Sequence, residues 1–506
     1  MSEFPILTTQ TVLPLAGAAI ALMSGRHARS VALITTLASV ALALAVWAQL
    51  PADGTMGMVE RHNWAPSLGI EYHLGVDGLG ALMVLLSAIV TLMSAAAASR
   101  VHHEPGVYFG LVLTLEAGLF GSFTALNFFH WFLFWELSLI PAFFLIKLWG
   151  GERRGPAATQ FFVYTMAGSA ALLVAFLAVF VSTGSMDFGR LTSLASTGAL
   201  EQMVKDHLGP AMMLWLAIGV LAGFAVKVPM IPFHTWLPAA YAEAPSPVTM
   251  LLTGAMSKMG VYGLLRIAIP LFGTQIAQMR TPLLVLAAAT VVMGAWAAAA
   301  QKDLKRVFAY LSVNHLGYCL LGIFALAVPA AGAAAVASQA AALNGVILQM
   351  FNHGVTAAAL FWFVAMMEQR TGGHRGIDDF GGLRKPAPVL AGLMGIALFS
   401  SLGLPGLNSF PGEFLIFRGV FSLAWVAATV SVLGLLVTAA VILTVIQKVF
   451  NGPVPSHCAG FPDLHHGERL ALIPVIGLML LIGILPRLIV DSVNPTVMNL
   501  LAHWRF

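Results

Sequence analysis

The chain has 506 residues, of which 59% are hydrophobic and only 9% are charged. Soluble domains carry about 25% charged residues, so a water-soluble fold of this length could not bury so much apolar surface, whereas a lipid bilayer would solvate it. The formal net charge of +4 does not indicate nucleic-acid binding, because basic residues of membrane proteins gather in their cytoplasmic loops. The composition therefore predicts a polytopic integral membrane protein.

The apolar runs predict an all-α fold with about fourteen transmembrane helices, since one spanning helix needs about 20 apolar residues. The spans are expected at 5–23, 31–50, 76–99, 107–126, 127–149, 160–182, 211–228, 247–270, 281–300, 304–327, 340–367, 388–404 continuing to 424, 426–450 and 470–491. The longest polar loops are expected at about 51–75 and 183–210. The two cysteines, Cys319 and Cys458, form no CxxC motif, which argues against a zinc or iron–sulfur site.

The loop charges predict the orientation. If the N-terminus lies outside, fifteen of the 25 Lys and Arg residues fall in inside loops and seven in outside segments. The positive-inside rule therefore favours both termini outside.

Two spans are interrupted by helix breakers. One contains Lys227-Val-Pro229-Met-Ile-Pro232, and the other contains Gly403-Leu-Pro405-Gly406. Proline removes a backbone donor and clashes with the preceding turn, so such breaks persist in membranes only where protein or water surrounds them. Matching breaks in two halves are typical of inverted repeats around a transport site, although a kinked structural helix is the simpler alternative for either one. The predicted organisation is an N-terminal part (1–106), two five-helix repeats (107–270 and 281–450) and a C-terminal part (451–506).

Seven ionisable residues of the predicted spans are candidates for function, because a charge at mid-membrane costs roughly 2.5–3.5 kcal/mol on insertion scales. They are Glu116, Glu136, Lys227, Lys258, His315, His353 and Glu413. Taken singly, Glu136 could be a neutral hydrogen-bonded acid or half of an ion pair, and either histidine could be an ordinary core residue. Lys258 lies mid-span and cannot easily reach the interface, whereas Arg266 lies near a span end and is expected to snorkel or to pair.

Together these residues suit proton transfer. Burial raises the pKa of a carboxylate and lowers that of a lysine or histidine, so the pKa values of the two kinds of group converge and protons can pass between them. A passive pore would more often show rings of one sign, and a metal site would need clustered ligands. The set is therefore interpreted as a proton path.

The motifs around these residues resemble those of the antiporter-like subunits of respiratory complex I, of the chain M type (chain 4 in mitochondria). They occur in the family's order over nearly the whole chain: Leu74-Gly-Val-Asp77, Phe134-Trp-Glu136, Lys227-Val-Pro229, Phe233-His-Thr-Trp236-Leu-Pro238, Lys258-Met-Gly260, Gln301-Lys-Asp303, Tyr310-Leu-Ser312, Asn352-His353-Gly354 and Gly412-Glu413. Each motif is weak alone, but nine in order are specific.

The resemblance implies a function for these residues. Glu136 would pair with Lys227, Lys258 would join two half-channels, His315 and His353 would lie on the axis, and Glu413 would face the exit. Glu116 matches a second family carboxylate. The resemblance further implies a proton-translocating subunit that binds no cofactor itself. NADH, FMN, iron–sulfur clusters and quinone would be bound by partner subunits, and the sister chains L and N would lie beside this chain in the bilayer.

Three other functions stay open. Glu413 argues against an Mrp-type cation/proton antiporter subunit, because the Mrp relatives and chains L and N generally carry lysine there. The segment Ala244-Pro245-Ser246-Pro247 is closer to hydrogenase-type and Mrp-type relatives, and Asn127 stands where many chain M sequences have an acid, so an energy-converting hydrogenase or related pump remains possible. A non-conducting scaffold subunit is the alternative of a different class.

Overall fold

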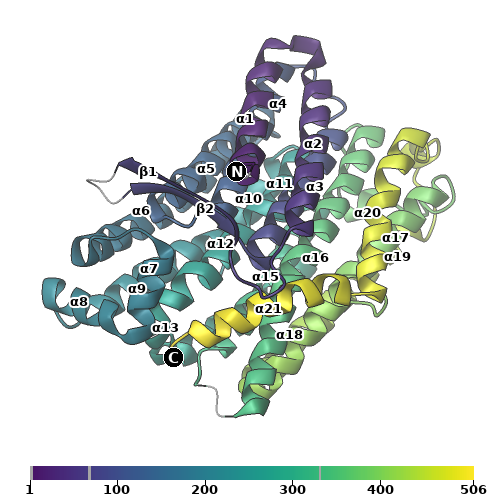
Figure 1. Ribbon diagram of the computed structural model, residues 1–506. Helices are drawn as coiled ribbons and strands as arrows, with labels where there is room; N and C mark the ends of the chain where they lie inside the picture. The colour runs from purple at the N-terminus through teal and green to yellow at the C-terminus, as the bar shows by residue number, and fades with distance from the viewer. Residues whose placement is uncertain (1–3, 66–69, 330–331) are drawn as a thin grey trace.

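The computed structural model describes residues 4–65, 70–329 and 332–506, which fold mainly into α-helices (Figure 1). The N-terminal part contains α1 (Ile6–Met23), η1 (Gly25–His27), α2 (Ala28–Ala48), β1 (Gly57–Ala65), β2 (Ile70–Val76) and α3 (Gly78–Ala97). Next come α4 (Pro105–Thr124), α5 (Phe128–Trp149), α6 (Arg154–Thr183), α7 (Phe188–Thr197), α8 (Ala199–Leu208), α9 (Met212–Lys227), α10 (Trp236–Glu243), α11 (Ser246–Leu251), η3 (Leu252–Met256), α12 (Lys258–Gly263), η4 (Leu264–Ala268) and α13 (Ile269–Gln278).

The second half begins at α14. It contains α14 (Arg280–Ala299), α15 (Leu304–Ala325), α16 (Ala333–Thr371), η5 (Ile377–Asp379), α17 (Pro388–Ser401), α18 (Ser409–Leu423) and α19 (Trp425–Phe450). The chain closes with η6 (Ser456–Cys458), α20 (His466–Ile484) and α21 (Arg487–His503). The elements η3 and η4 are π-helical and continuous with their neighbours, so one helix runs from Ser246 to Gln278.

The described part of the chain has 12 helices long and apolar enough to cross a membrane, or 13 if the bent pair α8 and α9 counts as one span. The multi-pass membrane fold is therefore confirmed, whereas the number of about fourteen stays a prediction. The difference arises at the predicted seventh and twelfth spans, where α9 has 16 residues and α17 has 14. Both are shortened by the breaks that follow them.

Both predicted breaks are present. At the first break, α9 ends at Lys227, and α10 begins only at Trp236. In the second half α17 ends at Ser401, and Gly403, with φ +78°, turns the chain before α18 begins. In each half the interrupted helix is the fourth of five spanning elements, which agrees in order with the predicted inverted repeats. The division into repeats itself stays a prediction.

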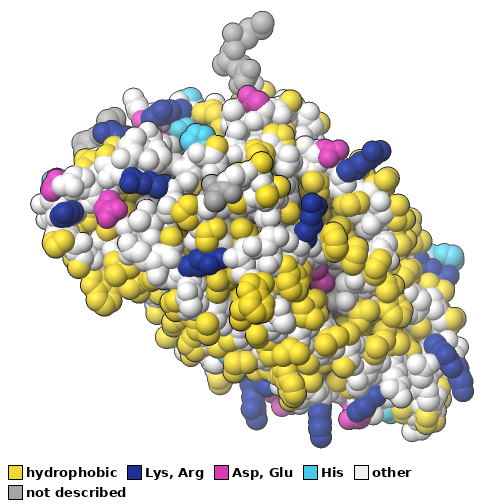
Figure 2. All heavy atoms as spheres, turned by 90° about the horizontal axis from the view of Figure 1, so that it is seen from below, with side chains coloured by type: hydrophobic (Ala, Val, Ile, Leu, Met, Phe, Trp, Pro, Cys, Tyr) yellow, Lys and Arg dark blue, Asp and Glu magenta, His cyan; other side chains and the backbone are white. Residues whose placement is uncertain are grey.

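The most buried helices lie in the interior of the bundle and come from both halves. The helix Ser246–Gln278, α15 and α16 are almost completely covered by other helices, whereas α2, α19 and α20 leave most of their side chains uncovered. Large hydrophobic side chains such as Leu37, Trp296 and Leu436 are exposed on the outside of the bundle, and Figure 2 shows hydrophobic side chains over much of the visible face. This pattern is the reverse of a soluble protein and places the polar residues of the covered helices away from lipid.

Strands β1 and β2 and helices α7 and α8 occupy the two segments that were expected to be loops, and α21 follows the last spanning helix. Strands β1 and β2 pair antiparallel, with Arg61 opposite His73. The short helices α7 and α8 follow α6, and α21 crosses the ends of the other helices (Figure 1). The α21 helix is fastened to α3 by a hydrogen bond of 3.0 Å from the Gly78 backbone N–H to Thr496 Oγ1. These elements form one end of the molecule, which the predicted orientation places outside.

Candidate proton-transfer site

Lys258 lies at the middle of the covered helix Ser246–Gln278, with none of its surface exposed. The π-helical segments η3 and η4 flank it, and π-turns interrupt the regular i→i−4 pairing of backbone groups. The Lys258 ammonium donates to the Thr253 carbonyl in η3 at 2.5 Å. Its Nζ also lies 2.6 Å from His353 Nδ1 on α16. The irregular helix thus supplies one partner for a buried lysine, and a histidine supplies the other.

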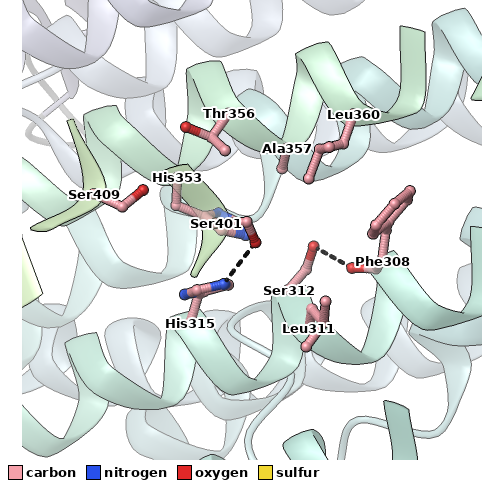
Figure 3. A pocket seen from close by; sticks show the side chains of 10 residues that line it. All are labelled: Phe308, Leu311, Ser312, His315, His353, Thr356, Ala357, Leu360, Ser401 and Ser409. Atoms are coloured by element: carbon pink, nitrogen blue, oxygen red, sulfur yellow. Dashed lines mark hydrogen bonds between the residues drawn. The ribbon is translucent and has the colours of Figure 1, made fainter. Parts of the chain in front are cut away.

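The rings of the two predicted histidines lie against each other beside a small cavity. The rings of His315 and His353 are 5.3 Å apart between centroids, and His315 Nε2 lies 3.2 Å from Ser401 Oγ. Figure 3 shows both rings with Ser312, Thr356, Ser401 and Ser409 around this space. The cavity volume open to the centre of a water molecule is about 10 Å³, which is room for about one water molecule.

Glu413 continues the series on α18. Its Oε1 lies 3.3 Å from His315 Nδ1, within ion-pair distance but without hydrogen-bonding geometry, and it accepts a hydrogen bond of 3.3 Å from Gln349 Nε2. Its Oε2 lies against Gly403, where a Cβ atom would stand 2.5 Å from that oxygen. The break after α17 therefore makes space for the carboxylate. Four of the predicted residues, Lys258, His353, His315 and Glu413, form one continuous series.

Two asparagines hold the second break together, and the sequence reasoning did not single out their role. Asn408 Nδ2 donates to the Asn352 carbonyl at 3.1 Å, and Asn352 Nδ2 donates to the Asn408 carbonyl in return. Ser400 Oγ donates to Asn408 Oδ1 at 2.6 Å. Backbone groups freed by a break in a membrane helix need such partners. Asn352 adjoins His353 in the sequence, and Asn408 lies within the predicted break, five residues before Glu413, which was the available indication.

The first half is arranged differently. Lys227 is 3% exposed at the end of α9, and its Nζ lies 4.8 Å from the centre of the Trp135 ring. Glu136 is close enough to interact electrostatically with Lys227, but no ion pair within 4 Å joins the two among the described residues. Glu136 Oε1 is buried without a hydrogen-bond partner. The expected Glu136–Lys227 pair is therefore not in direct contact in this structure.

Glu116 lies apart from the series. Its carboxylate on α4 is completely buried beside the Ser39 hydroxyl of α2, and neither oxygen has a hydrogen bond with proper geometry. Within the part of the chain that the structure describes, no hydrogen bond or ion pair joins it to the other six predicted residues. Its assignment to the proton path stays a prediction.

A polar cluster lies at the opposite end of the helices from α21 and was not predicted. Lys305 Nζ lies 3.6 Å from Glu368 Oε1 and donates to the Ala244 carbonyl at 2.9 Å. Ser246 Oγ donates to the other Glu368 oxygen at 2.8 Å. Lys305 was counted as an inside-loop residue, but it is 3% exposed, because the Pro245 segment folds over it.

Comparison with known proteins connects this arrangement to one family. Residues 125–439 match the family described as NADH:quinone oxidoreductase/Mrp antiporter, TM. The chain is 34% identical over 511 residues to the NADH-quinone oxidoreductase subunit M of Rhodobacter capsulatus, covering 99% of this chain and 97% of that protein. It is 31% identical to the protein of the same name from Mycobacterium tuberculosis, covering 99% and 94%.

Solved structures give the same result for the fold. A chain in the structure of respiratory complex I from Thermus thermophilus with bound NADH superposes with a TM-score of 0.87 at 29% identity, covering 99% of this chain and 100% of that one. A chain of the Mrp complex from a Dietzia species superposes with a TM-score of 0.84 at 21% identity, covering 99% and 98%. The second match shows the shared fold alone.

Proposed function

The chain belongs to the transmembrane family shared by NADH:quinone oxidoreductases and Mrp antiporters, and from this membership we propose that it is a proton-translocating subunit of a complex I-type NADH–quinone oxidoreductase. Its relatives in Rhodobacter capsulatus and Mycobacterium tuberculosis carry the name of subunit M of that enzyme. The redox chemistry, with NADH, FMN, iron–sulfur clusters and quinone, belongs to partner subunits. Sister antiporter-like chains L and N are the proposed neighbours in the bilayer, and both termini lie outside.

The observation that carries the proposal is the series from Lys258 to Glu413. Lysine, histidine and glutamate all bind and release protons, and the first and last steps of the series are short enough for transfer directly or through one water. The middle step joins two imidazole rings whose centroids are 5.3 Å apart. The distances are 2.6 Å from Lys258 Nζ to His353 Nδ1 and 3.3 Å from His315 Nδ1 to Glu413 Oε1, with a water-sized cavity beside the two histidines. A scaffold would have no reason to bury these groups in mutual reach.

The proposed sequence of events begins in the first half, at Glu136 and Lys227. When Glu136 is close to Lys227, the carboxylate stabilises the charged lysine; when they separate, burial favours loss of the proton toward Lys258. Lys258 then passes a proton to His353, His353 passes it to His315, and His315 delivers it to Glu413 for release outside. The separation of Glu136 from Lys227 in this structure is compatible with the open position of such a switch.

The test is redox-driven pumping in membranes that contain the assembled complex. Glu136→Gln and Lys227→Ala are expected to lose most proton translocation while assembly and subunit content survive. Glu201→Gln and Lys147→Ala are the matched controls, because both side chains are exposed, and they should pump normally. A normal proton-to-electron ratio in an assembled Lys227→Ala complex would refute the proposal and favour the scaffold function. Sodium-dependent transport would instead favour the Mrp-type function.

A further inference from the structure

A large cavity lies on the predicted outer side of the first half. The volume open to the centres of water molecules is about 670 Å³. The cavity lies between the β1–β2 hairpin, α7 and α21. Most of its lining is apolar, from residues such as Leu126, Phe188 and Leu500. Its polar lining includes Asp77 and Arg266. Solvent in this cavity would therefore reach the helix that carries Lys258.

Arg266 and Asp77 form an almost completely buried ion pair at this place. The Arg266 Nη2 donates to both Asp77 oxygens, at 2.6 and 2.7 Å, and the side chains are 7% and 4% exposed. Asp77 Oδ1 also accepts from the Gly80 backbone N–H at 3.1 Å, as the cap of α3. Arg266 Nε has no hydrogen-bond partner, although it is buried. Arg266 thus pairs rather than snorkels, and its position is fixed by the start of α3.

The pair lies between the cavity and Lys258. Arg266 follows Lys258 by eight residues on one helix, or about 12 Å along the axis, and Tyr262 lies halfway between them. The Arg266 guanidinium lies 5.6 Å from the centre of the Tyr262 ring. The Tyr262 hydroxyl is committed as a donor to the Phe123 carbonyl at 3.1 Å. The helix therefore presents an arginine and an engaged tyrosine on the side of Lys258 that leads to the outer cavity.

These groups differ chemically from those on the other side of Lys258. Histidine and glutamate release protons at ordinary pH, whereas a guanidinium stays charged in proteins and passes none on. A fixed positive charge also repels cations, as arginines do in channels that exclude protons. We propose that Arg266, held by Asp77, is an electrostatic seal that prevents protons on Lys258 from escaping into the outer cavity, so that they leave through His353 and Glu413.

This inference rests on the proposed function, because a seal is needed only if Lys258 carries protons. The alternative is that the pair only stabilises the packing of α3 against the helix of Lys258. The two accounts predict different results when only one of the two charges, that of Asp77 or that of Arg266, is removed. A structural pair is broken equally by losing either partner, whereas the seal requires only the guanidinium.

The experiment measures passive proton flux, without NADH, into sealed vesicles that contain the assembled complex under an imposed membrane potential. Arg266→Gln is expected to leak roughly tenfold faster, the factor that one unit charge at about 12 Å produces at an effective dielectric constant of about 20. The double variant Asp77→Asn/Arg266→Gln also loses the neighbouring negative charge, so its leak should exceed that of the unchanged protein but stay below tenfold. Asp77→Asn keeps the guanidinium, and the amide oxygen of the new side chain can still accept the hydrogen bond from Arg266 Nη2, so this variant should stay as tight as the unchanged protein. The double variant leaves no buried charge unpaired, so it gives the decisive result if Arg266→Gln assembles poorly.

Adding Lys258→Met to the double variant tests the route. The leak should disappear, because the seal separates the cavity from Lys258 itself. An assembled double variant with unchanged flux would overturn the inference, as would equal leaks in Asp77→Asn and Arg266→Gln, or a leak that survives Lys258→Met. None of these readings depends on redox-driven pumping, so failure of the seal is distinguishable from failure of the proposed function.

Discussion

Two groups of ionisable residues in the membrane domain differ in how closely their members lie. From Lys258, on the last helix of the first half, a series runs into the second half through two histidines to a glutamate, with Lys258 Nζ 2.6 Å from His353 and His315 Nδ1 3.3 Å from Glu413. In the first half, Lys227 lies over Trp135, and Glu136 is beyond ion-pair distance from it. The second half is thus already connected in this conformation, whereas the first needs a movement to connect. The comparison teaches that the first half is where a coupling motion would act.

The largest effect is expected from the end of the connected series. Glu413→Gln keeps the shape of the side chain but removes its ability to bind and release a proton, so transfer through the second half should slow by about 10²-fold or more. Glu116→Gln should have a much smaller effect, because Glu116 has no contact with the series. Redox-driven proton uptake into vesicles measures both, and equal losses would remove the distinction between the two carboxylates.

A comparison of two buried histidines sharpens the same point. His353 contacts Lys258 Nζ, whereas His130 on α5 is equally buried, with no hydrogen bond to its Nδ1. His353→Gln should slow proton translocation about tenfold, equivalent to about 1.4 kcal/mol in the barrier. The reason is that Lys258 loses the neighbouring group that can take up its proton. His130→Gln is expected to pump normally once assembled. If both variants pump alike, the location of His353 in the series has no functional meaning.

A smaller effect is expected where no ionisable residue changes. Gly403→Ala would place a Cβ atom 2.5 Å from Glu413 Oε2 and would force a non-glycine residue into φ +78°, at a strain of about 1–3 kcal/mol. The carboxylate should move away from His315, and pumping should fall several-fold. Gly395→Ala on α17 is the control, because nothing lies within 4 Å of its added Cβ. Equal pumping by the two variants would show that the break does not position Glu413.

The smallest expected effect concerns the outer loops of the first half. Burial alone would raise the pKa of Asp187, but its hydrogen bonds with His73 and the Arg190 backbone N–H hold that pKa below its usual value. This stabilisation is present above the ordinary aspartate pKa and is lost as the pH falls through the lowered one. Asp187→Asn should therefore loosen α7 at neutral pH by at most about 1 kcal/mol. Hydrogen exchange of α7 amides measures this, and unchanged exchange would contradict it.

Much of this architecture could be predicted because its causes are local. Pro229 and Pro232 end α9 because proline lacks a backbone N–H and its ring clashes with the preceding turn. Gly403 turns the chain where other residues would be strained. The buried ionisable residues were identifiable because each lies in an apolar run. The hairpin and α7 were missed because short polar elements lack the long apolar pattern of a span.

The contacts between distant residues could not be predicted by such local reasoning. Lys258 and His353 are 95 residues apart, so only the packing of α16 against the Ser246–Gln278 helix brings them together. Arg266 and Asp77 are 189 residues apart, which is why the sequence left snorkelling and pairing equally open. The separation of Glu136 from Lys227 is likewise a property of the conformation and not of the motifs.

The central claim is that Lys258 connects the two halves of one proton path. The direct test is the proton-to-electron ratio of the assembled complex with Lys258→Met, which preserves the length of the side chain and removes its proton. The account predicts that NADH oxidation continues at a measurable rate with a clearly lower ratio. An unchanged ratio in a fully assembled complex would contradict it.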